Sequence, residues 1–187
     1  MRLILLVFIY FFAKTSWGLS PCPTKCPNHN SSYVLDYYWR DYFGTVPYDA
    51  FPGGLDEEDQ ITYIGQVYLK EYELLPGTLY RGCPIILTSA YDITEIKSNK
   101  FIKILCSNLP YKLKWKATRQ GEVNTLTGCH LVIGGAEVGV TVYIGRTRFN
   151  GQTIIGKVFY GEGIDSALAI PGTNQRFTNF EILTYNC

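Results

Sequence analysis

Short runs of mixed apolar and polar residues, separated by glycine, proline or asparagine, fill the chain after residue 37. Ile61–Leu69 and Val140–Phe149 combine β-branched and aromatic residues with polar ones, which is typical of strands with one solvated face. Further short strands are predicted at Leu131–Ile133, Lys157–Tyr160, Ala167–Ile170 and Asn179–Tyr185. Strands this short and closely spaced favour an antiparallel meander over alternating strands and helices.

One segment carries a second pattern, because the apolar residues between Ile93 and Leu105 could also form one face of a helix. The matching segment later in the chain contains Pro171 and Gly172, which interrupt helices. We therefore predict that the end of this segment is a strand.

The chain repeats its features in the same order, which indicates a duplication. Five features of the first copy recur in the second. Trp39 corresponds to Trp115, and Gly53-Gly54-x-Asp56 corresponds to Gly134-Gly135-x-Glu137. The other pairs are Tyr63-Ile64-Gly65 with Tyr143-Ile144-Gly145, Leu75-Pro76-Gly77 with Ile154-Ile155-Gly156, and Lys103-Ile104-Leu105 with Glu181-Ile182-Leu183. The offset is 76 residues at the tryptophans, 80 at the tyrosines and 78 at the closing triplets. We predict one repeat over residues 37–109 and a second over 110–187, with both tryptophans packed in the core.

The N-terminus reads as a secretory signal over residues 1–18, with Arg2 before an apolar run and small residues at Ser16 and Gly18. The run is shorter than the roughly 20 residues of a membrane-spanning helix, so we expect cleavage and secretion, with an uncleaved anchor as the less favoured alternative. Residues 19–36 are rich in cysteine, proline and asparagine and predict a surface tail. Within it, Asn30-Ser31-Ser32 is a candidate glycosylation site.

The charge limits the possible functions of the protein, and the cysteine content indicates its compartment. Loss of Arg2 and Lys14 with the signal leaves 15 basic against 16 acidic residues, which does not favour nucleic-acid binding. Six cysteines suit an oxidising compartment, so three disulfides are expected, although the sequence does not give their pairing. The candidates are Cys22, Cys26, Cys83, Cys106, Cys129 and Cys187.

The sequence motifs do not indicate an enzyme or a cofactor-binding protein. The chain has two histidines, His29 and His130, and no Gly-x-Ser-x-Gly nucleophile motif or phosphate-binding glycine loop, so we expect neither an enzyme nor a cofactor. Cys22, Cys26 and His29 have the spacing of half a zinc site, but disulfides are favoured in a secreted chain.

The ordered set of Trp, Gly, a Gly-Gly-x-acid turn, a Tyr-Ile-Gly strand, a Pro-Gly turn and a closing Glu-Ile-Leu strand resembles the DM-nine repeat. That unit is found in secreted invertebrate proteins, in mollusc mannose-binding lectins and beside a pore-forming module in natterin-like proteins. The second copy matches more closely than the first. The resemblance implies an all-β fold of two small pseudo-symmetric antiparallel sheets with strands exchanged between the copies. Only four residues follow Leu183, so a pore-forming module is not expected.

The resemblance also implies a sugar site, because lectins of this family hold the sugar with an acid after the Gly-Gly turn and a lysine after the Pro-Gly turn. These positions correspond to Glu137 and Lys157 in the second copy, and to Asp56 and Thr78 in the first. A carboxylate accepts and an ammonium group donates hydrogen bonds, which suits neighbouring sugar hydroxyls. The alternative is that the Gly-Gly pairs only form turns and Lys157 is a solvated strand residue.

We therefore expect a secreted, extracellular carbohydrate-binding protein that recognises mannose-type glycans through Glu137 and Lys157, with a weaker case for Asp56. One such site gives millimolar binding, about −4 kcal/mol, so useful avidity would need a homodimer or clustered glycans. The alternative is a secreted structural or interaction protein that has kept the scaffold and lost the sugar site, which the absence of a lysine at Thr78 favours. The sequence does not give the glycan, the oligomeric state or the tissue.

Overall fold

A computed structural model describes residues 37–91, 93–160 and 166–187. The predicted signal and tail, with Asn30, Cys22 and Cys26, lie outside these residues. The described part is all-β, as the sequence predicts: it holds fifteen strands and two short 3-10 helices, η1 (Pro110–Lys112) and η2 (Val123–Thr125). No helix among the described residues is long and apolar enough to cross a membrane.

The strands fall into two sets, which we call the first half (residues 38–106) and the second half (residues 113–185). The first half contains β1 (Tyr38–Asp41), β2 (Pro52–Leu55), β3 (Ile61–Leu69), β4 (Glu73–Leu79), β5 (Ile86–Thr88), β6 (Ile96–Ser98) and β7 (Ile102–Cys106). The second contains β8 (Leu113–Arg119), β9 (His130–Leu131), β10 (Ile133–Glu137), β11 (Val140–Phe149), β12 (Gln152–Phe159), β13 (Leu168–Ala169), β14 (Arg176–Phe177) and β15 (Asn179–Tyr185).

The mixture of apolar and polar residues predicted the long strands correctly. The bounds of β3, β11 and β15 are those predicted, while β12 begins earlier than expected, at Gln152. The ambiguous segment after Ile93 forms β6 and β7 and no helix, which confirms the predicted strand at its end. The apolar pattern of a helix was misleading here because Phe101, one of its residues, does not face a core. The Phe101 side chain is 76% exposed at the turn into β7.

The two halves pair their strands in the same order and register. In the first half Gly65 lies opposite Gly77 on one side and Ile104 on the other. In the second half Gly145 lies opposite Gly156 and Ile182 in the same way. The outer strands agree as well, because Trp39 faces Leu105 and Trp115 faces Leu183. This correspondence is consistent with two pseudo-symmetric subdomains.

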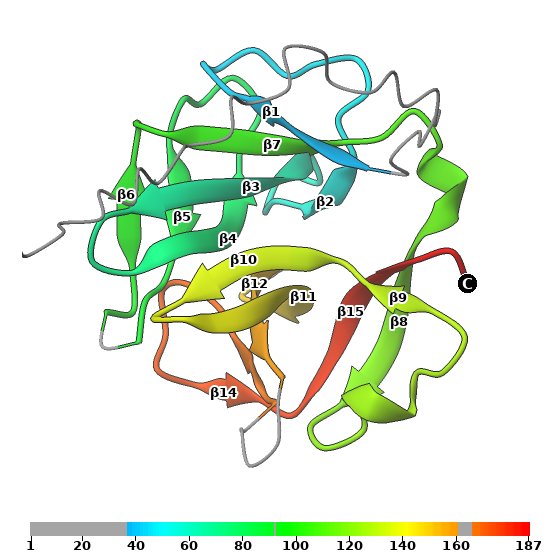
Figure 1. Ribbon diagram of the computed structural model, residues 1–187. Helices are drawn as coiled ribbons and strands as arrows, with labels where there is room; N and C mark the ends of the chain where they lie inside the picture. Colours follow the sequence, from blue (N-terminus) through cyan, green and yellow to red (C-terminus); the bar gives the residue numbers. More distant parts are fainter. Residues whose placement is uncertain (1–36, 92, 161–165) are drawn as a thin grey trace, which may run out of the picture. The chain divides into compact units, whose positions relative to one another are not determined.

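The halves are joined at their Gly-Gly strands. Ala136 of β10 pairs with Leu74 of β4, which connects all the strands into one hydrogen-bonded network instead of two separate sheets (Figure 1). Side chains cross in both directions at equivalent places: Gln66 donates to the carbonyl of Gly134, and Arg146 donates to that of Gly53, each at 2.7 Å. Each half is therefore completed by contacts from the other.

A shared core lies between the halves. One buried cluster draws on both, with Phe51, Ile64 and Leu105 from the first half and Leu113, Val132, Ile144, Ile155 and Leu183 from the second. Trp39 and Trp115 pack against this cluster with partly buried rings, as predicted. Two further clusters each belong to a single half.

The described cysteines differ in state. Cys129 and Cys187 form a disulfide that ties the C-terminus to the segment before β9. Cys83 and Cys106 are free thiols, so the structure supports one of the three bridges expected from the sequence.

Candidate functional site

The structure brings together the two residues predicted for the second copy. Glu137 ends β10 and Lys157 lies within β12, and the Lys157 Nζ is 2.5 Å from Glu137 Oε2. The same ammonium group donates to the backbone carbonyl of Ser89 at 2.8 Å. Lys157 therefore links its own half to the segment that follows β5 in the first half.

This ion pair is buried. Each of the two side chains is 2% exposed, and Lys157 is among the largest fully buried residues of the described chain. Apart from the ion pair, neither carboxylate oxygen of Glu137 has a hydrogen-bond partner among the described residues. Burial lowers the pKa of Lys157, the hydrogen bond and charge of Glu137 oppose that shift, and the charge of Arg176 adds to it. A direct contact of either charged group with a sugar stays a prediction, and it would require the pair to open.

The first-half counterparts are not brought together in the same way. Thr78 is 1% exposed, and its hydroxyl accepts a hydrogen bond from the backbone N–H of Ile155 at 3.0 Å. Asp56 is partly exposed, and its Oδ1 accepts from the backbone N–H groups of Glu58 and Gln60, at 3.0 and 2.7 Å. Asp56 therefore stabilises its own turn, while Thr78 fastens β4 to the second half.

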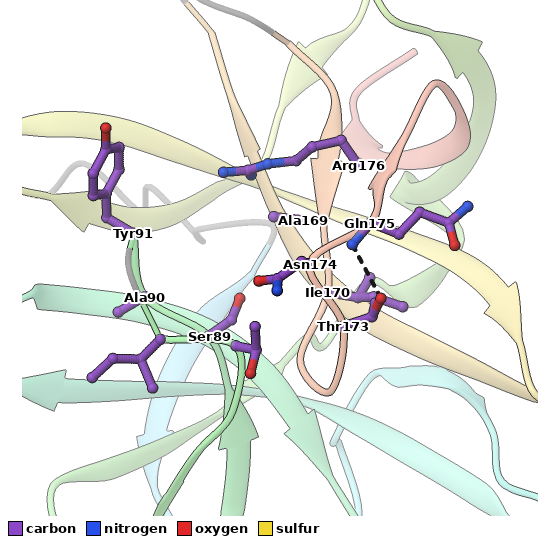
Figure 2. Close-up of a pocket in the computed structure, with 11 residues that line it drawn as sticks. Ser89, Ala90, Tyr91, Ala169, Ile170, Thr173, Asn174, Gln175 and Arg176 are labelled. Carbon is purple, nitrogen blue, oxygen red and sulfur yellow. Dashed lines mark hydrogen bonds between the residues drawn. The ribbon is translucent and has the colours of Figure 1, made fainter.

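A polar pocket opens beside the buried pair, between the segment after β5 and the β13–β14 turn (Figure 2). One wall is formed by described residues that follow β5, among them Ser89 and Tyr91, and the other by residues of β13, β14 and the turn between them, among them Asn174 and Arg176. In Figure 2 the Arg176 side chain extends toward Tyr91, and the side chains of Ser89 and Asn174 point into the middle. The described lining is completed by Ala90, Ile93, Thr94, Ala169, Ile170, Thr173 and Gln175. Both halves therefore contribute to this pocket.

Strand register explains why the hollow lies here. Lys157 faces Ala169 across β12 and β13, and Ala169 faces Arg176 across β13 and β14. Directly opposed residues in an antiparallel pair share a face of the sheet, so the three side chains lie in one row. The short methyl group of Ala169 leaves space between the two long cations. The bond from Lys157 to the Ser89 carbonyl then holds the opposite wall in place.

Few features of the sequence indicated these pocket residues. Thr173 to Arg176 form a polar run directly after the Pro171-Gly172 turn, which was the one available signal. The exposed aromatic ring at the pocket is Tyr91, which is 79% exposed. Tyr143, Phe159 and Tyr160 lie near Glu137 or Lys157 in the sequence, but none of them is among the residues that line the pocket. The described residues hold no group of three or more His, Cys, Asp or Glu side chains that could bind a metal ion.

Fold and site together define an all-β protein with a polar pocket between two similar halves. Residues 85–171 match the family model described as the DM9 repeat, a family associated with carbohydrate-binding, lectin-like proteins. The match includes Glu137, Lys157 and the Ser89 wall, and it supports the resemblance found in the sequence motifs. No curated protein matches the chain.

Proposed function

We propose that this protein is a secreted carbohydrate-binding protein, not an enzyme, and that it holds a single sugar unit in the pocket between the described residues after β5 and the β13–β14 turn. The observation that carries the proposal is the pocket itself, where the Ser89 hydroxyl and the Asn174 amide point into the middle and the exposed Tyr91 lies at the edge (Figure 2). Such groups donate and accept hydrogen bonds as sugar hydroxyls require, and a tyrosine ring can cover the apolar face of a sugar.

Lys157 and Glu137 have a positioning role in this proposal. Lys157 anchors the Ser89 carbonyl, and the contact with Glu137 holds the lysine side chain in place, so the pocket wall depends on both. The family resemblance makes mannose the first sugar to test. We also propose that residues 37–109 and 110–187 are two DM9 repeats, on the basis of their matching strand registers.

A glycan array probed with the mature protein tests this function, and Ala169→Leu is the decisive variant. Leucine at this position would fill the hollow without removing a charge, so sugar binding should be lost in a variant that circular dichroism shows to be folded. Ala117→Leu, at an exposed position of β8 outside the pocket, is the matched control and should bind as the wild type does. Absence of binding on a broad array, or binding unaffected by Ala169→Leu, would contradict the proposal.

A second function is favoured by one observation, the burial of the Lys157–Glu137 pair. A buried pair can serve the fold alone, and the protein would then be a secreted structural or interaction protein without a sugar site. Lys157→Ala does not separate the two functions, because it would weaken the fold in either case. The Ala169→Leu comparison does, since it leaves the ion pair intact.

A further inference from the structure

Arg176 places a positive charge at the pocket that no described residue balances. Its side chain is exposed, and it makes no ion pair or hydrogen bond within the described part of the chain. The neighbouring cation, Lys157, is already balanced by Glu137. None of the described lining residues is acidic, and Asp92 lies outside the described residues.

The equivalent place in the first half is built differently. There Thr78 faces Leu87 and Leu87 faces Lys97, in the register that Lys157, Ala169 and Arg176 have in the second half. Leu87 takes the place of Ala169, so a larger side chain occupies the position of the hollow.

The charge at this place also differs between the halves. Lys97 is paired with Glu95, whose carboxylate lies 3.0 Å from its ammonium group. Glu95 stands two residues before Lys97, and the residue two before Arg176 is the neutral Asn174. Among the described residues, the second half thus combines a hollow with a cation that has no acidic partner, and the first half has neither.

We infer that the pocket selects a sugar ring that carries a carboxylate, a hexuronic acid, over the corresponding neutral hexose, and that Arg176 binds the carboxylate. This inference rests on the proposed function. The planar guanidinium group presents paired N–H donors that match the two oxygens of a carboxylate. The side chains of Ser89 and Asn174 point into the middle of the pocket, where they can meet the ring hydroxyls (Figure 2).

The experiment compares two sugars that differ only at C6: methyl α-mannopyranosiduronate, which carries a carboxylate, and methyl α-mannopyranoside, which carries a hydroxymethyl group. Titration calorimetry or ligand-observed NMR on the mature protein gives both dissociation constants. The acid should bind about tenfold more tightly, because one charge-assisted contact at a partly exposed site is worth that factor. This preference should shrink as sodium chloride rises to about 0.5 M.

Two variants assign the effect to Arg176. Arg176→Gln should reduce the preference for the acid over the neutral mannoside to about onefold, because the charged contact is lost. Asn174→Glu places an acid at the position that Glu95 has in the first half, where Glu95 balances Lys97. This variant should also remove the preference for the acidic sugar. Arg148→Gln, at an exposed arginine of β11 outside the pocket, is the matched control and should keep the full preference.

The outcomes separate the two proposals. Equal binding of both sugars by the wild type would overturn the inference and leave the proposed function standing. A preference that survives Arg176→Gln would also overturn it, because the selectivity would then come from another group. Binding of neither sugar by the wild type, with none on the array, would overturn the proposed function and the inference with it.

Discussion

The first and second halves share a backbone arrangement and differ in the side chains placed on it. Gly77 and Gly156 occupy the same place in the two halves, and an added Cβ would lie 2.2 Å from the carbonyl oxygen of Leu87 or 2.0 Å from that of Ala169. No other residue fits there, so both halves keep glycine. The next position is Thr78 in one half and Lys157 in the other, and both are buried. The comparison teaches that close backbone approach fixes the fold, whereas a neighbouring buried position accepts different chemistry if its polar atoms find partners.

The largest expected difference between the halves is at these two positions. Lys157→Met should lower the free energy of unfolding by about 3–5 kcal/mol, because it leaves the Glu137 carboxylate buried without its partner. Thr78→Val should cost less, about 1–3 kcal/mol, since it leaves only one backbone N–H without a hydrogen bond. Urea denaturation of both variants measures the difference.

The double variant Glu137→Gln/Lys157→Met is the control for this interpretation. It removes both charges, so it should be more stable than Lys157→Met alone. If Lys157→Met proved no more destabilising than Thr78→Val, the ion pair would not be buried in solution as the structure describes.

The second expected difference concerns the chain ends of the two halves. Cys187 follows β15 and is bonded to Cys129, whereas β7 ends at the free thiol of Cys106. Cys129→Ser should lower the free energy of unfolding by about 2–4 kcal/mol, as loss of a disulfide in a small domain commonly does. Denaturation without reductant measures it, and reductant should destabilise the wild type but leave the variant unchanged. A variant as stable as the wild type would show that the bridge does not constrain the second half.

The third difference is in pH dependence and concerns Cys106, whose place in the second half is taken by Thr184. Burial, followed by the nearby charge of Asp49, raises the pKa of the Cys106 thiol from 9.0 to about 11. The folded protein therefore holds the thiol proton of Cys106 more tightly than the unfolded chain does. The stability that the protonated thiol contributes is complete below pH 9 and is lost as the pH rises to about 11.

Cys106→Thr tests this by copying the second half into the first. Between pH 9 and 11 the wild type should lose roughly 2–3 kcal/mol more stability than the variant. Thermal melting at a series of pH values gives the two slopes, and the difference cancels the other titrating groups. Parallel slopes would mean that Cys106 is not shielded from solvent.

Much of the fold could be predicted from the chain alone. Alternation fixed the bounds of β3, β11 and β15, because one face of each is solvated and the other buried. The pairing across the halves could not be predicted. Ala136 opposite Leu74, and Gln66 bonded to the Gly134 carbonyl, depend on which strands meet after folding, and no local pattern records that.

The candidate site shows the same division. The sequence motifs singled out Glu137 and Lys157 as partners, and the structure places their charged atoms 2.5 Å apart. Their burial was not evident, since a lysine in a strand usually reaches solvent. The pocket was missed because its two walls, which contain Ser89 and Arg176, lie far apart in the sequence and belong to different halves.

The strands, the turns and the repeated order of glycines, tryptophans and charged residues could thus be predicted from the amino-acid sequence. They depend on local conformation and on a regular alternation of buried and exposed side chains. The tertiary structure alone decided that Lys157 is enclosed and anchors Ser89, that Ala169 leaves a hollow, and that Arg176 faces it without a balancing acid in the described chain. These features depend on strand register and on contacts between the halves, where one residue's surroundings come from segments distant in the sequence.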